Sequence, residues 1–212
     1  MNYQDFYKRP MNIENNSMSI IEAEMKSPES FTKQELQIVK RVIHTTADFD
    51  YENFIRMNHD FIQAFSEAIK KGLPIITDTN MVKAGINKRT LSQFGCEIHC
   101  FVGDEDVRKV ARETGMTRSV KAIDKAVNTF DEALFVFGNA PTALVRLLEL
   151  TEQKKAFPQG IVGVPVGFVG AKESKELLAR HEVPHITTLS RKGGSNVAAA
   201  IVNAILYMIG ER

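Results

Sequence analysis

The middle and C-terminal parts of the chain alternate short β-like runs with longer helical segments, and no other feature constrains the fold as strongly. The β-like runs are LPIITD, CEIHCFV, EALFVF, GIVGVPVGFV and PHITTL, and one or two helical segments separate each run from the next. Strands that alternate with helices in this way form a mostly parallel sheet covered on both faces by helices. We therefore expect an α/β protein with three α/β/α layers and a mostly parallel central sheet.

The length and composition are those of one large domain. The chain has 212 residues, 43% of them hydrophobic, which is enough for a continuous core. No repeat, low-complexity tract or flexible linker divides it, so we expect a single domain over residues 1–212, with the helical segments before residue 72 packed around the sheet. The net charge of +1 lacks the basic excess of a nucleic-acid-binding protein, and we expect no nucleic-acid partner.

The chain carries no strong signal for a membrane or for export. Its N-terminal stretch, MNYQDFYKRPMNIENN, is polar and lacks the apolar region of a secretion signal. The longest apolar run, VAAAIVNAILYMIG, contains Asn203 and is shorter than the ~20 residues that a membrane span requires. We expect a soluble, cytoplasmic protein without a membrane partner.

The segment CEIHCFV contains both cysteines of the chain, Cys96 and Cys100, with His99 beside the second. Three such residues in close succession suggest a metal site. The same segment alternates apolar and polar residues with the period of a strand, and no second pair of ligands lies elsewhere. The strand interpretation is therefore favoured, and we predict no metal site.

Four turns that follow predicted strands place glycine or small polar residues where helices begin. These turns are DTNMVKAGI, in which Asp78 or Thr79 can cap the helix, GNAPTAL, GFVGAKES and SRKGGSN. The candidate ligand-binding residues in the last three are Gly138, Asn139, Gly170, Gly193, Gly194 and Ser195. The carboxyl ends of parallel strands meet at one edge of the sheet, where open α/β folds bind ligands. We expect Ser195 to cap the closing helix and the helix after GFVGAKES to begin near Ser174.

Such residues are also ordinary turn chemistry, so each turn alone has a structural interpretation. Three glycine-bearing turns that open helices at one edge form, together, a plausible set of anion sites. Basic residues accompany them, namely Arg118, Lys172, Arg191 and Lys192. This combination suits a ligand with several separated carboxylates or phosphates. A dinucleotide is disfavoured because no turn has the G-x-G-x-x-G spacing.

His44 ends the segment KQELQIVKRVIH, whose apolar residues recur at helical spacing. One interpretation is structural, since a histidine at a helix C-terminus can bind the last free carbonyls and interacts well with the helix dipole. The other is catalytic, since histidine titrates near neutral pH and can donate or accept a proton. This stretch by itself leaves both open.

The ordered blocks ENNSMSIIEAE, RVIHTTADFD, TDTNMVKAGI, GMTRS, FGNAPTALVRLLEL, GVPVGFVGAKESKELL and RKGGSNVAAAIVNAIL cover almost the whole chain. In these blocks the chain resembles the precorrin-8X methylmutase family of cobalamin biosynthesis, including its cobalt-precorrin-8 branch. The resemblance implies a homodimeric isomerase that needs no added cofactor. It implies that a methyl group moves from C-11 to C-12 of the corrin precursor, giving hydrogenobyrinate, or cobyrinate when cobalt is already inserted.

The same resemblance assigns roles to residues. It places the acid/base histidine on His44 and substrate contacts on Ser17, Arg41 and Arg118. The predicted substrate-binding set also contains Thr45 and Ser119, from the same blocks, and the glycine-turn residues named above. Because the substrate is a macrocycle fringed by carboxylates, it needs amide and arginine donors together with aliphatic walls. The predicted walls are Met81, Val82, Phe168 and Val169.

In this interpretation His44 supplies a proton near a ring nitrogen while the methyl group migrates. A non-catalytic tetrapyrrole carrier is the alternative, because it would need the same carboxylate sites and no proton donor. A nucleotide-dependent oxidoreductase is a further alternative, which the absence of the dinucleotide fingerprint disfavours. The segment HTTADFDY is more similar to the cobalt-dependent branch, but the sequence leaves open whether the natural substrate contains cobalt.

Overall fold

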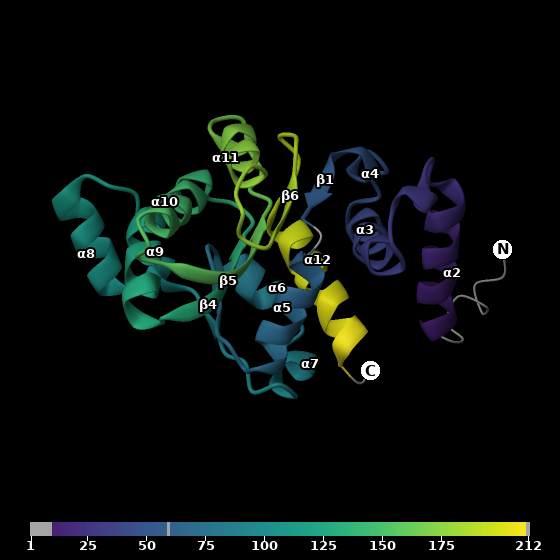
Figure 1. The fold of residues 1–212 in the computed structure, drawn as a ribbon, viewed down its shortest axis with the longest axis horizontal. Coiled ribbons are helices and arrows are strands. Elements are labelled where there is room, and N and C mark those ends of the chain that lie inside the picture. The colour runs from purple at the N-terminus through teal and green to yellow at the C-terminus, as the bar shows by residue number, and fades with distance from the viewer. Residues whose placement is uncertain (1–9, 59, 211–212) are drawn as a thin grey trace.

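A six-stranded sheet organises the structure, a computed structural model that describes residues 10–58 and 60–210 (Figure 1). The strands are β1 (Ile55–Met57), β2 (Ile75–Thr77), β3 (Ile98–His99), β4 (Glu132–Phe137), β5 (Phe157–Gly163) and β6 (His185–Thr188). Their order across the sheet is β1-β6-β5-β4-β2-β3. Only β1 is antiparallel to its neighbour, and the other pairings are parallel. The predicted mostly parallel sheet is confirmed.

The two faces of the sheet bury separate sets of side chains, because alternate residues of a strand point to opposite faces. In β4, Leu134 and Val136 belong to one hydrophobic cluster, whereas Phe135 and Phe137 belong to the other. Both faces are covered by packed side chains, which is why the strands consist of almost continuous apolar residues.

Helices cover both faces and give the predicted three layers (Figure 1). One face carries α9 (Arg118–Thr129), α10 (Pro141–Glu152) and α11 (Ala171–Leu178), and α8 (Glu105–Thr114) packs on α9. The other face carries α5 (Phe61–Lys70), α6 (Asn80–Gly85), α7 (Lys88–Ser92) and α12 (Ser195–Ile209). Beyond α12 lie α3 (Lys33–Thr46) and α2 (Pro10–Glu24), with the short α4 (Tyr51–Phe54) leading from α3 to β1.

Helix α12 lies between the sheet and α3, which explains why apolar residues surround most of its circumference. Gly85 allows α6 to approach α12 closely, since a Cβ there would lie 2.8 Å from the Cβ of Ala199. Asn203, which interrupts the apolar run of α12, donates to the Gly85 carbonyl and accepts from the backbone N–H of Asn87. The Asn203 side chain thereby supplies hydrogen-bond partners to two backbone groups, the Gly85 carbonyl and the Asn87 N–H, where α6 ends and α7 begins.

Several local predictions need correction. The chain before residue 72 contributes the edge strand β1 in addition to the predicted helical segments. The stretch NMVKAGINKRTLSQFG forms two helices, because Asn87 leaves the helix and caps α7 through the Thr90 amide. Helix α11 begins at Ala171 and not near Ser174. Gly194, not Ser195, is the N-cap residue of α12.

Within the described ranges, the structure contains no helix that is both long and apolar enough to cross a bilayer.

Candidate active site

His44 lies in the last turn of α3, and the sequence around it explains why the helix ends there. A capping box of Thr32 and Glu35 starts the helix. At the other end, Ala47 adopts the left-handed conformation with φ of 51°, and its amide donates to the Ile43 carbonyl. The Thr46 hydroxyl donates to the Val42 carbonyl at 2.8 Å. The helix therefore satisfies these two carbonyls without the histidine.

The His44 side chain is exposed and forms no hydrogen bond or ion pair within the described part of the chain. Its side chain borders a pocket of about 260 Å³ between α3, the end of α6 and one side of α12. The pocket is lined by Arg41, His44, Thr45, Gly85, Asn196, Ala199, Ala200, Asn203 and Tyr207. An imidazole that is free to contact a ligand agrees with the acid/base interpretation better than with a helix-capping role.

Arg41, one turn before His44, is held in place by two contacts. Its guanidinium donates to Glu14 of α2 at 2.7 Å and lies 5.1 Å from the centre of the Tyr207 ring of α12. The side chain is only 16% exposed. Arg41 therefore holds its guanidinium in a fixed position at the wall of the His44 pocket, with Glu14 balancing its charge.

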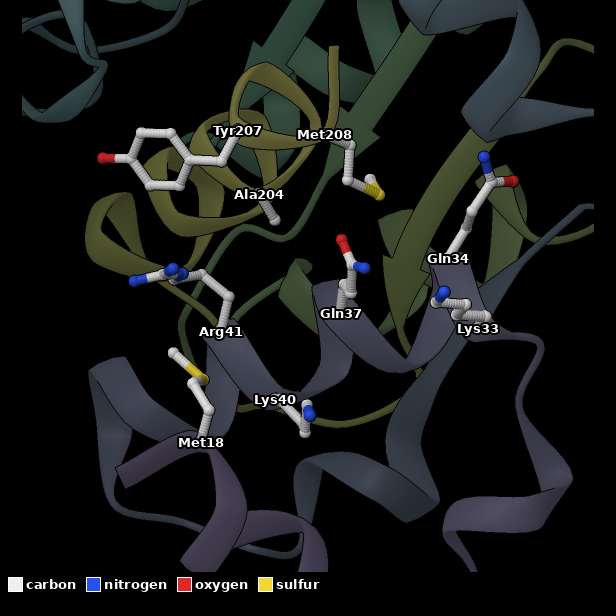
Figure 2. A pocket seen from close by; sticks show the side chains of 9 residues that line it. All are labelled: Met18, Lys33, Gln34, Gln37, Lys40, Arg41, Ala204, Tyr207 and Met208. Carbon is white, nitrogen blue, oxygen red and sulfur yellow. The ribbon is translucent and has the colours of Figure 1, made fainter. Parts of the chain in front are cut away.

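A second pocket adjoins the first, because Arg41 and Tyr207 line both. It measures about 540 Å³ and lies between α2, α3 and the end of α12. Figure 2 shows Gln37 and Arg41 of α3 extending toward Tyr207 and Met208 of α12, with Met18 of α2 on the opposite side. Its remaining lining residues are Lys33, Gln34, Lys40 and Ala204.

Ser17 lies on α2, one turn after Glu14, and is half-buried. Its hydroxyl donates to the Ile13 carbonyl of the same helix at 2.8 Å. The structure does not place Ser17 among the residues that line the His44 pocket. A substrate contact by Ser17 thus remains a prediction.

The turn after β4 binds an internal carboxylate. Buried Asp78, which follows β2, accepts hydrogen bonds from the amides of Gly138, Asn139 and Ala140 at 3.0, 2.7 and 2.7 Å. Burial raises the pKa of Asp78, and the three amide donors oppose that rise. The anion at this turn is therefore part of the protein, and a substrate contact here would use the exposed Asn139 side chain instead of these amides.

The turn after β6 packs tightly on the end of β5. A Cβ on Gly193 would overlap the Val164 carbonyl, and the Gly194 amide donates to that carbonyl at 2.9 Å. The Ser195 hydroxyl pairs with Thr79 Oγ1 at 3.1 Å. Thr79 also caps α6 by accepting from the Val82 amide, so this pair joins the start of α12 to the start of α6.

Helices α6 and α12 connect the His44 pocket to the sheet edge. Gly85 and Asn196 line the pocket, and Met81 lies one turn before Gly85 on the exposed side of α6. Met81, Phe168 and Val169 are 74%, 82% and 90% exposed, so large apolar side chains stand in solvent at this edge. Val82 was predicted to join them, but it is fully buried and cannot contact a ligand.

Arg118 and Ser119 open α9 at the far side of the same edge. The hydroxyl of Thr117, which caps α9, lies 3.4 Å from that of Thr142 in the first turn of α10. The exposed Arg118 borders a pocket of about 650 Å³, which Arg108, Ala111, Arg112, Gly115 and Met116 also line. Three guanidinium groups at one pocket suit a ligand with carboxylates.

The basic residues predicted near the turns differ in their availability. Lys192 binds Asp48 and Asp50 at 2.7 Å each, and Lys172 pairs with Glu176. Arg191 lies over the exposed ring of Phe168 at 5.6 Å. Neither Arg191 nor Arg118 forms an ion pair within residues 10–58 and 60–210, so these two cations face solvent.

The CEIHCFV segment uses its cysteine and histidine side chains in packing. The Cys96 thiol donates to the Ile69 carbonyl at 3.1 Å, and burial raises its pKa to about 11. The His99 ring lies against the rings of Phe101 and Phe130.

Known proteins similar to this chain identify its family. The profile of the precorrin-8X methylmutase (CbiC) family matches residues 12–208. The chain belongs to the precorrin-8X methylmutase family. A cobalt-precorrin-8 methylmutase of Salmonella typhimurium (strain LT2) is 46% identical over 211 residues, which cover 97% of this chain and 99% of that protein. The corresponding protein of Leptospira interrogans is 44% identical over 209 residues, which cover 95% and 94%.

The fold is also that of a solved methylmutase. A precorrin-8X methylmutase from Thermus thermophilus has a TM-score of 0.86 and 36% identity, and the match covers 93% of this chain and 95% of that one. This methylmutase is therefore an isomerase of corrin biosynthesis, because a methylmutase moves a methyl group within one molecule. The tetrapyrrole carrier, which was the alternative, finds no support among these relatives.

Three structural anchors were not singled out from the sequence. The sequence indicates Asp78 only as a possible helix cap and Lys192 only as a basic residue near a ligand-binding turn, and it gives no role to Lys175. An acidic residue directly after a buried strand is the one signal that could have revealed Asp78. Nothing in the sequence identifies the partners of Lys175 and Lys192, because they lie 13 to 144 residues away.

Proposed function

We propose that this methylmutase moves a methyl group from C-11 to C-12 of cobalt-precorrin-8 and releases cobyrinate. The choice of the cobalt-containing substrate follows the names of the two relatives that are 44% and 46% identical. In this proposal cobalt is part of the substrate and is not a resident metal of the protein.

The macrocycle has a large apolar face and a fringe of carboxylates, and the sheet edge offers both kinds of contact. Exposed Met81, Phe168 and Val169 suit the apolar face. Arg41 and Arg118 suit carboxylates. The hydroxyl groups of the half-buried Ser119 and the exposed Thr45 suit them as well. The predicted set also includes the turns at this edge that contain Gly170, Gly193, Gly194 and Ser195. Ser17 on α2 is assigned to the substrate only by the family resemblance.

His44 is the proposed acid/base residue. The observation that carries this proposal is its exposed ring, which borders a pocket beside Arg41 and has no hydrogen-bond partner in the described residues. The methyl shift needs no nucleophile from the protein, because both bonds change within the substrate. A proton or hydrogen bond from His44 to a ring nitrogen draws electron density away as the methyl group migrates and the conjugated system re-forms.

We also propose that the chain works as a single domain in a cytoplasmic homodimer and binds no nucleic acid. The two hydrophobic clusters pack on opposite faces of the same sheet, and this arrangement supports a single domain. The family resemblance supports the homodimer, and the net charge of +1 agrees with the absence of a nucleic-acid partner.

The test is turnover of cobalt-precorrin-8 and of metal-free precorrin-8X under identical conditions, followed by the absorption spectrum. We expect conversion of the cobalt substrate at the higher kcat/KM. Conversion of only the metal-free substrate would contradict the assigned substrate, and a spectrum that changes on binding but not with time would contradict catalysis.

A further inference from the structure

Lys175 occupies a position in α11 where an apolar residue is expected. The buried residues of this helix are Ala171, Ser174, Lys175 and Leu178, which is the spacing of the stripe that faces the core. The lysine is 0% exposed. A charged side chain on this stripe costs free energy unless its contacts compensate for the lost hydration.

The ammonium group of Lys175 binds the turn that follows β6. It donates to the Lys192 carbonyl at 2.7 Å and to Thr188 Oγ1 at 3.2 Å. The Thr188 hydroxyl donates to the same carbonyl at 2.9 Å. No carboxylate forms an ion pair with Lys175 among the residues that the structure describes. The group therefore binds backbone and hydroxyl oxygens, and burial lowers its pKa to about 8.

The carbonyl that Lys175 holds directly precedes the glycine pair of the turn. Gly193 has no room for a side chain against Val164, and the Gly194 amide is bound to the Val164 carbonyl. Helix α12 begins at the next residue, and Asn196 in its first turn lines the His44 pocket. The direction of the Lys192 carbonyl thus helps to set where α12 starts.

The side chain of Lys192 extends the connection to the His44 region. Its ammonium group binds Asp48 and Asp50, which follow α3 by only a few residues. Lys192 is consequently held at both ends, by Lys175 at its carbonyl and by the two aspartates at its Nζ atom.

We propose that Lys175 is a positioning residue of the methylmutase site. It fixes the turn of residues 190–195 and, through Lys192, fixes that turn relative to the segment that follows His44. This inference rests on the proposed placement of the substrate at the sheet edge between these elements. Lys175 itself is buried and contacts no substrate.

The test compares Lys175→Met with Ser174→Ala. Methionine keeps the volume of the buried side chain and removes both hydrogen bonds. Ser174 is a matched control, because it is equally buried on the same helix but its hydroxyl donates only to Ala171 within that helix. We measure amide hydrogen exchange of residues 188–197, affinity for the product, and single-turnover rate per folded molecule.

We expect Lys175→Met to speed exchange in residues 190–195 and to weaken product affinity by up to about tenfold, because the charge-assisted hydrogen bond no longer holds the turn in its binding conformation. Ser174→Ala should leave both unchanged. A second pair of variants covers the case in which Lys175→Met fails to fold. Thr188→Val removes the other donor to the Lys192 carbonyl, and Thr187→Val is its control because the Thr187 hydroxyl binds Gly163 on β5 instead.

Thr188→Val should change exchange and affinity in the same direction as Lys175→Met, and Thr187→Val should not. Unchanged exchange and affinity in Lys175→Met, or in Thr188→Val when Lys175→Met does not fold, would overturn the inference. That outcome would leave the role of His44 intact. Normal turnover by His44→Ala would instead contradict the proposed site, whatever the exchange data show.

Discussion

An ammonium group that is buried without a carboxylate partner, as in Lys175, should make the free energy of unfolding depend on pH. Burial disfavours the charged form of Lys175 and lowers its pKa from 10.5 to about 8. Its contacts with the Lys192 carbonyl and Thr188 compensate only in part. The folded state therefore releases this proton at a lower pH than the unfolded state.

The free energy of unfolding should rise with pH through this group. Below pH 8 both states hold the proton, and burial of the charge lowers the free energy of unfolding by up to about 3 kcal/mol. Between pH 8 and 10.5 the unfolded state binds the proton and the folded state does not, so this destabilisation disappears. Urea unfolding of the wild type and Lys175→Met from pH 7 to 10 measures the effect.

The difference between the two proteins is the relevant quantity, because the buried Cys96, Cys100 and Tyr51 also make the free energy of unfolding depend on pH. Burial raises the pKa of each of them, which lowers stability as the pH rises, but equally in both proteins. The stability of the wild type relative to Lys175→Met should increase with pH. A difference that stays constant from pH 7 to 10 would contradict the account of Lys175.

The sequence identifies which residues can carry chemistry better than it identifies their contacts. It places His44 at a helix end, and the structure agrees. It does not show that Thr46 and Ala47 occupy the nearby carbonyls and leave the imidazole free. The sequence also does not reveal that Lys175 is buried, because the many charged residues of AKESKELL indicate a solvent-exposed helix. Only the packing of α11 on the sheet shows which side of the helix faces inward.

At the element scale, Asp78 ties the end of β2 to the turn between β4 and α10. Its two carboxylate oxygens accept from three consecutive amides. Gly138 lies so close to Ser195 that a Cβ would be 2.6 Å from the Ser195 Cα atom. One buried carboxylate thus orders the turn against which α12 begins.

Asp78→Asn should lower the free energy of unfolding by about 2–4 kcal/mol. The asparagine side chain replaces one accepting oxygen with an NH2 group, which faces a backbone N–H and leaves that buried donor without an acceptor. Chemical denaturation measures this loss. Asp131→Asn is the matched control, since Asp131 is exposed and its replacement should change stability by less than about 0.5 kcal/mol. Equal stability of the two variants would show that Asp78 does not anchor the turn.

The elements themselves were predictable where the pattern is long and strong. β4 and the helices α10 and α12 lie where periodicity and turn residues placed them. The antiparallel β1 was missed because three residues are too few to show a period, and its pairing with β6 is a long-range contact. The N-cap of α12 differed because Ser195 bonds to Thr79, which lies 116 residues away.

In the molecule as a whole, one edge of the sheet, where the parallel strands end, carries both exposed apolar side chains and arginines without an ion pair in the described residues. The apolar side chains are Met81, Phe168 and Val169, and the arginines are Arg118 and Arg191. α12 buries its apolar residues within the chain, so the dimer prediction depends on the family resemblance. We expect light scattering at micromolar concentration to give about twice the chain mass of 23.8 kDa. A monomer under these conditions would contradict the proposed dimer.

We propose above all that His44 supplies a proton or a strong hydrogen bond to the substrate during methyl migration. The most direct test is the single-turnover rate of His44→Ala, with product affinity and melting temperature measured on the same sample. We predict near-normal affinity and melting temperature, because the carboxylate contacts and the helix end do not involve the imidazole. The rate should fall by roughly 10²–10⁴-fold. A near-normal rate in the folded variant, or a lower melting temperature with catalysis preserved, would contradict the claim.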